Sequence, residues 1–145
     1  MREFNIDEIR GREVNKVMEF KNPQDRKIVS IESIPVFEIG CEIHPDREIR
    51  YVLAVIKDTN GNSKLIARAD NLSSHNDIFE TFTPDIFEQF RTHPKPMGGG
   101  FISFNESEKS IKIYGTSTGF GQADHKKMAE ILASAYPGWR IEIGN

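Results

Sequence analysis

Residues 71–80, Asn-Leu-Ser-Ser-His-Asn-Asp-Ile-Phe-Glu, place a histidine among small polar residues where a helical pattern begins. Serine side chains accept hydrogen bonds from the free amides of a first helical turn, so we expect Ser73 or Ser74 to cap a helix that starts beside His75. Those amides and the positive end of the helix dipole attract anions, above all phosphate. An imidazole with an ordinary pKa of ~6.5 can exchange a proton there near neutral pH. A surface histidine without a chemical role is the plainer alternative.

Two further stretches carry residues suited to holding a ligand. Thr116-Ser117-Thr118-Gly119-Phe120-Gly121 combines hydroxyl groups with glycines, and such a loop can present several backbone amides to one anion. It lacks the lysine and the spacing of a P-loop, so no nucleotide is implied. The triple glycine Gly98-Gly99-Gly100 has two interpretations of equal weight: a bulged strand start, or a place where a ligand approaches the backbone closely.

Composition limits the class of protein. The chain has 145 residues, of which 37% are hydrophobic and 28% charged, which suits one domain that buries its own core. No apolar run approaches the ~20 residues that cross a bilayer, and the N-terminus lacks the apolar segment of a secretion signal. The single cysteine excludes an intramolecular disulfide. We expect a cytoplasmic protein without a membrane partner, and the net charge of -3 argues against general nucleic-acid binding.

Runs of β-branched and aliphatic residues indicate about six strands, several of them joined as hairpins. The dipeptide Asn60-Gly61 is the strongest hairpin signal, and residues 105–109 are expected to form a second hairpin turn. The expected strands cover residues 33–39, 50–57, 63–69, 101–104, 110–115 and 139–143.

Two main helices are expected. The first begins at His75, and Thr83-Pro84 predicts a new cap and first turn at which it restarts. Its apolar side is expected to comprise Ile78, Phe79, Phe82, Ile86, Phe87 and Phe90. The second runs from Gln122 to about Ala135. The predicted fold is α+β, a mixed and mostly antiparallel sheet of about six strands with the two helices packed on it.

Residues 1–30 are predicted to be an N-terminal extension with one short amphipathic helix between Ile6 and Phe20. The rest of the chain carries three motifs in a distinctive order: His75-Asn76-Asp77-Ile78-Phe79, the triple glycine before a strand, and the run from Ile111 to His125. Together they resemble the Janus/Ocnus family, which includes a eukaryotic protein histidine phosphatase. The resemblance implies one Janus/Ocnus-like phosphohistidine phosphatase domain over residues 31–145.

The resemblance also implies roles for particular residues. The family's essential histidine falls on His75. Its first basic position falls on Arg50, where the phosphatase has lysine. Its second falls on Arg68, although the loop that follows is one residue shorter here.

After the hydroxyl-rich loop the correspondence continues. The loop serine of the family falls on Ser117, followed by Thr118 and Gly119, and the histidine after the loop falls on His125, where Asp124 replaces a glutamine neighbour. One position departs from the family: the phosphatase has an arginine directly after the triple glycine, and this chain has Phe101. Phenylalanine cannot make the charge-assisted contact of an arginine, which puts the substrate range in doubt.

The implied reaction is hydrolysis of a phosphoramidate, either protein phosphohistidine, phospholysine or a small phosphoramidate. The pocket must mainly hold the phosphoryl oxygens and deliver water. His75 would act as general base, with a brief nucleophilic role as the alternative. The expected oxygen ligands are Arg50, Arg68, His125 and the backbone amides of Asn76, Ser117, Thr118 and Gly119.

No metal or cofactor is expected, because the histidines show no ligand spacing and the carboxylates do not cluster. The protein is expected to work as a monomer. Two other classes stay open: a non-catalytic module that binds phosphate or phosphoprotein, for which Phe101 gives some reason, and a regulatory interaction protein on the same fold.

Overall fold

The computed structural model describes residues 30–45 and 47–144. The chain divides after Ser33 into two units. Of the first, only residues 30–33 are described, and Ile31–Ser33 form a 3-10 turn (η1) in which the Ser33 amide donates to the Ser30 carbonyl at 3.0 Å. The short helix expected between Ile6 and Phe20 lies outside the described residues.

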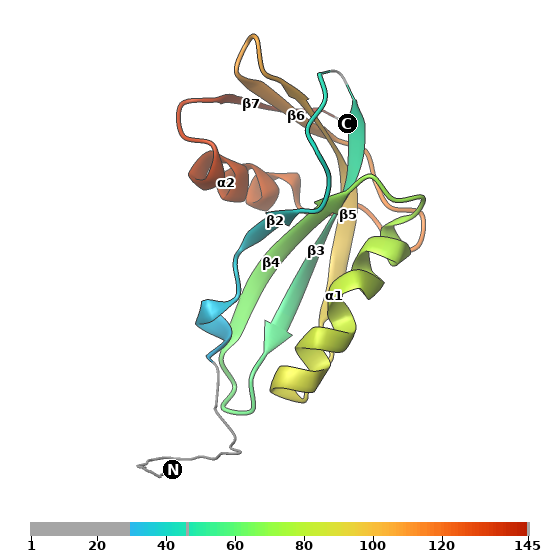
Figure 1. The fold of residues 1–145 in the computed structure, drawn as a ribbon, viewed down its shortest axis with the longest axis vertical. Coiled ribbons are helices and arrows are strands. Elements are labelled where there is room, and N and C mark those ends of the chain that lie inside the picture. Colours follow the sequence, from blue (N-terminus) through green and yellow to red (C-terminus); the bar gives the residue numbers. More distant parts are fainter. Residues whose placement is uncertain (1–29, 46, 145) are drawn as a thin grey trace. The chain divides into compact units, whose positions relative to one another are not determined.

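A six-stranded mixed sheet forms the centre of the second unit (Figure 1). In spatial order its strands are β2 (Phe37–Ile39), β4 (Ser63–Asp70), β3 (Glu48–Lys57), β5 (Lys95–Asn105), β6 (Ser110–Tyr114) and β7 (Arg140–Ile143). The two outer pairs, β2 with β4 and β6 with β7, are parallel, and the three inner pairs are antiparallel. With the helices α1 (His75–Phe90) and α2 (His125–Ala135), this confirms the predicted α+β fold.

The two helices pack on opposite faces of the sheet (Figure 1). Successive residues of a strand point to opposite faces. Tyr51 and Leu53 of β3 belong to the core cluster that contains Met128 of α2, so the fully buried Val52 between them points to the α1 face. Burial on both faces explains why β3 is nearly continuous apolar sequence. Among the residues that the structure describes, no helix is both long and apolar enough to cross a membrane.

Helix α1 continues through Pro84, so the predicted restart at this point is wrong. A proline inside a helix removes one backbone hydrogen bond. Ile78 and Ile86 are buried on either side of it, and this packing holds the helix together across the interruption. Thr83 does not cap a new helix, because its hydroxyl donates to the carbonyl of Phe79 at 2.6 Å within the same helix.

Several smaller expectations also differ from the structure. The first strand of the unit begins at Phe37 and not at residue 33, and β5 begins at Lys95 and includes the triple glycine. Phe87 is exposed and stacks on His93 with ring centroids 4.5 Å apart, so it is not on the buried side of α1. Helix α2 begins at His125, because the Asp124 side chain caps it by accepting from the next two amides.

The triple glycine lies between two histidine rings. A Cβ atom on Gly99 would lie 2.7 Å from Cδ2 of His75, and one on Gly100 would lie 2.8 Å from Cε1 of His125. The backbone is therefore approached closely at these glycines, as one of the two interpretations expected. The approaching groups are side chains of the protein and not a ligand. The bulged interpretation also holds, because the register between β3 and β5 shifts next to Gly98, whose φ is 114°.

We predict that Gly100→Ala lowers the free energy of unfolding by about 1–3 kcal/mol, because the added methyl group overpacks the sheet. It would lie 2.8 Å from the carbonyl oxygen of Tyr114, which is backbone and cannot turn away. Urea denaturation measures the change. Gly119→Ala is the matched control, since no atom lies within 4 Å of its added Cβ, and it should change stability by no more than about 0.5 kcal/mol. Equal stability of the Gly100 variant and the wild type would contradict this account.

Candidate functional site

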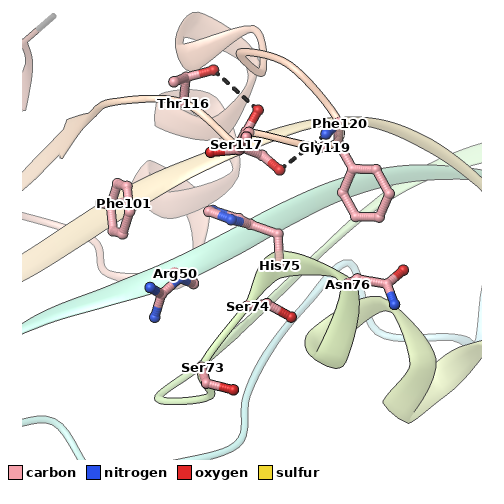
Figure 2. Close-up of a pocket in the computed structure, with 11 residues that line it drawn as sticks. Arg50, Ser73, Ser74, His75, Asn76, Phe101, Thr116, Ser117, Gly119 and Phe120 are labelled. Atoms are coloured by element: carbon pink, nitrogen blue, oxygen red, sulfur yellow. Dashed lines mark hydrogen bonds between the residues drawn. The ribbon is translucent and has the colours of Figure 1, made fainter.

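A cavity of about 490 Å³ opens where the start of α1 faces the loop that follows β6 (Figure 2). The serines before α1 and the first residues of that helix form one side, and β3, β5 and the loop form the others. The lining residues are Arg50, Ser73, Ser74, His75, Asn76, Phe101, Thr116, Ser117, Thr118, Gly119 and Phe120. The structure thus brings together six of the eight residues predicted for the site, and His75 lies in their middle.

The hydrogen bonds of His75 fix which of its nitrogens can take a proton. Ser74 caps α1 by accepting from the amide of Asp77 at 3.0 Å, so His75 is the first helical residue. The ring is buried and its Nε2 lies 2.9 Å from the carbonyl oxygen of Gly100. Because a carbonyl can only accept, Nε2 carries the hydrogen and Nδ1 keeps its lone pair. No described residue donates a hydrogen bond to this Nδ1.

Burial lowers the pKa of His75 below its ordinary 6.5, the Gly100 hydrogen bond opposes that change, and the Arg50 guanidinium lowers the pKa further. Desolvation and a nearby positive charge both disfavour the imidazolium. His75 is therefore a neutral base at neutral pH.

Backbone amides on two sides of the cavity have no partner among the described residues. The amides of Thr118 and Gly119 make no hydrogen bond to any described residue, and neither does that of Asn76 in the first turn of α1. Each of these residues lines the cavity. Amides of this kind, together with a helix N-terminus, form a site for an anion.

Ser117 contributes differently from what the sequence predicted. Its amide donates to the Gly121 carbonyl at 3.2 Å, and the Gly121 amide donates back at 2.8 Å. Its hydroxyl oxygen accepts from the amide of Phe120 at 3.1 Å. The Ser117 amide is thus used to close the loop and is not free for a ligand, while the buried side chain still lines the cavity.

Arg50 supplies the positive charge among the lining residues. One of its terminal nitrogens donates to the Leu72 carbonyl at 2.7 Å, and its guanidinium carbon lies 5.5 Å from the centre of the Phe101 ring. Within residues 30–45 and 47–144, no carboxylate forms an ion pair with it. Its remaining donors are available to an anion in the cavity.

Arg68 is not brought to this cavity, although the sequence predicted it as a phosphate ligand. Its side chain extends from β4 toward β2 and donates to the carbonyls of Ala67 at 2.8 Å and Pro35 at 3.1 Å. It also lies 3.5 Å from the Glu38 carboxylate, and it lines a separate cavity of about 350 Å³. A long side chain takes the nearest acceptors, and these lie at the edge of the sheet.

His125 is also outside the cavity, contrary to its predicted role as a ligand. Its Nε2 donates to the Gly115 carbonyl at 2.9 Å, and its Nδ1 accepts from the Tyr51 hydroxyl at 2.5 Å. Burial raises the pKa of Tyr51 well above its ordinary value, so the hydroxyl stays protonated as the donor. Both ring nitrogens are used, and His125 fixes the residue from which the hydroxyl-rich loop departs.

The residues predicted for the site did not include Ser73, Thr116 or Phe120, although all three belong to the two stretches that the sequence marked as suited to a ligand. One essential partner was missed altogether. The carbonyl of Gly100 gave none, because every residue has one. Among the described residues, no three histidine, cysteine or acidic side chains lie together as a metal site would require.

We predict that NMR titration places the pKa of His75 below 6.5, and that Arg50→Gln raises it by removing the nearby cation. Arg140→Gln, which removes an exposed cation on β7 outside the cavity, is the control and should leave this pKa unchanged. An unchanged His75 pKa in the Arg50 variant would contradict the electrostatic assignment.

The same depressed pKa makes stability depend on pH. Below pH 6.5 the unfolded chain binds a proton at His75 before the folded protein does, so folding stability falls as pH drops from 6.5 toward the folded pKa. We expect His75→Gln to remove this part of the decline, which urea denaturation across that pH range measures.

Comparison with known proteins agrees with the resemblance found in the sequence. Residues 34–140 match the Janus/Ocnus family. The sex-regulated protein janus-A of Drosophila mauritiana is 38% identical over 104 residues, which are 71% of this chain and 76% of that protein, and janus-A of Drosophila melanogaster is 36% identical over the same shares. The sex-regulated protein janus-B of Drosophila teissieri is 31% identical over 134 residues, 89% of this chain and 91% of its own. The matched region contains all the described residues that line the cavity, and the chain belongs to the Janus/Ocnus family.

Proposed function

We propose that the protein hydrolyses phosphoramidates without a metal ion, with protein phosphohistidine as the first candidate substrate and phospholysine as the second. The observation that carries the proposal is His75, a neutral imidazole whose Nδ1 has no donor among the described residues and which lies among unpartnered amides and one cation. A base and an anion site in one cavity are what phosphoryl transfer to water requires.

The reaction follows from this arrangement. The amides of Asn76, Thr118 and Gly119, with the Arg50 guanidinium, would bind the phosphoryl oxygens and balance their charge. Nδ1 of His75 would take a proton from a water molecule as the water oxygen bonds to phosphorus. The phosphorus–nitrogen bond would break and its electrons pass to the leaving nitrogen, which takes a proton from solvent and leaves as imidazole or an amine. His75 would then return its own proton to solvent. Direct attack by Nδ1 on phosphorus is the alternative route, and it uses the same lone pair.

A binding module without catalysis is the second candidate function, and Phe101 favours it. This ring stands at the rim of the cavity where the phosphatase of the resemblance has arginine, so Arg50 is the one permanent cation among the lining residues that the structure describes. A site with fewer cations holds a phosphoryl group but stabilises the charge of a transition state less. The cytoplasmic location and the monomeric state stay predictions.

We predict that His75→Ala lowers the hydrolysis of phosphohistidine-labelled protein and of inorganic phosphoramidate by about 100-fold or more, because a general base is lost. Phosphate release is measured in the presence of EDTA, and the wild-type rate should not change with the chelator. His44→Ala is the matched control, since His44 is exposed and does not line the cavity. Full activity in the His75 variant would remove the proposed mechanism.

A binding experiment separates the two candidate functions. We predict that inorganic phosphate shifts the NMR signals of the Asn76, Thr118 and Gly119 amides, and the Ser117 amide less, because its hydrogen stays bonded to Gly121. Arg50→Gln should weaken binding about tenfold, as expected for one lost charge-assisted hydrogen bond. Phosphate binding by a protein that hydrolyses none of the substrates would favour the binding module, and no shift at any amide would count against both candidates.

A further inference from the structure

Phe101 is placed directly against the ring of His75. The two ring centroids lie 5.4 Å apart and the ring planes are inclined by 78°. In Figure 2 the imidazole of His75 points toward Phe101, so the edge of the imidazole meets the face of the phenyl ring. The face of a phenyl ring carries negative potential, and the edge of an imidazole carries positive potential.

The structure holds Phe101 in this position from its other side as well. Tyr114, its register partner on β6, lies beside it with ring centroids 6.0 Å apart and planes inclined by 23°. A Cβ atom on Gly115 would lie 2.7 Å from Cδ2 of Phe101, so the chain needs glycine there to make room for the ring. The contact with His75 is therefore a built feature of the sheet and not the chance position of a surface side chain.

Few charged groups near His75 can affect its protonation. From β3, Arg50 lines the cavity, and Glu48 is engaged by the Tyr114 hydroxyl. On α1 itself, the Asp77 carboxylate accepts from the Ser73 hydroxyl at 2.8 Å. The loop of residues 116–121 has hydroxyl groups and no charged side chain, and β5 presents Phe101 and glycines.

We infer that Phe101 is a positioning residue for His75, whose ring face stabilises the imidazolium that forms when Nδ1 takes a proton from water. The catalytic consequence rests on the proposed function, while the physical claim concerns protonation of His75 in the free protein. An imidazolium over an aromatic face gains a cation–π interaction that the neutral ring lacks. An arginine in the same place would instead repel the imidazolium. With phenylalanine in place of arginine at this position, the protonated ring of His75 carries part of the positive charge of the site.

NMR titration of His75 in phosphate-free buffer tests the inference. Phe101→Leu keeps an apolar side chain and removes the π face, so it should lower the pKa of His75 by about 0.4–0.8. Phe101→Tyr keeps the face and should retain the wild-type pKa, and Phe101→Arg should lower it further than leucine does, by adding a like charge. Phe120→Leu is the matched control: Phe120 lines the same cavity, but its ring packs on Phe79 at 5.4 Å.

The order of the His75 pKa values decides the outcome. The inference is supported if the His75 pKa is higher in wild type and in Phe101→Tyr than in Phe101→Leu. It should also be higher in Phe101→Leu than in Phe101→Arg. An unchanged or higher pKa in Phe101→Leu would overturn it, as would an equal fall in Phe120→Leu. Should the leucine variant fail to fold, Phe101→Met, which also lacks a π face and adds no charge, takes its place in the comparison with Phe101→Tyr.

A kinetic measurement separates this inference from the proposed function. In an active enzyme, the acid limb of the kcat/KM profile should move with the pKa of His75 in each variant. The predicted order of pKa values without hydrolysis by any variant would support the contact between the rings and sink the proposed phosphatase activity.

Discussion

The hydrogen bond from Nε2 of His75 to the Gly100 carbonyl joins the first residue of α1 to the central strand β5. It holds the imidazole beside Gly99, and it leaves Nδ1 as the nitrogen that can accept a proton. Burial of this ring disfavours its protonation, and the hydrogen bond to Gly100 opposes that effect. The position of the ring and its tautomer thus follow from one interaction between residues 25 positions apart.

The second histidine supports the site from the opposite face of β5. His125 packs on Gly100 and bonds to the Gly115 carbonyl, and the loop that begins there carries the unpartnered amides. Two rings on opposite faces of one strand therefore place the base and the anion site with respect to each other. Neither ring would reach its place if β5 carried ordinary side chains at these positions.

Features set by neighbouring residues were mostly predictable from the sequence, and several contacts between distant residues were not. The serine cap of α1 and the hairpin at Asn60-Gly61 depend on neighbouring residues, so the pattern was sufficient. Arg68 has a long side chain with several acceptors in reach, and only the folded sheet decides among them. The Ser117 amide was predicted to bind a ligand, but in the folded loop it donates to the Gly121 carbonyl. Pro84 indicated a helix break, but packing on either side of it prevailed.

The glycine-rich start of β5 has a thermodynamic consequence for the whole fold. Three adjacent glycines enlarge the conformational freedom of the unfolded chain, and each disfavours an ordered strand by roughly 0.5–1 kcal/mol relative to alanine. That entropy opposes folding at the strand on which both histidines rest. The apolar packing of α1 and α2 on the two faces of the sheet must offset this entropy. Residues far from the cavity therefore contribute to the shape of the cavity by keeping β5 ordered.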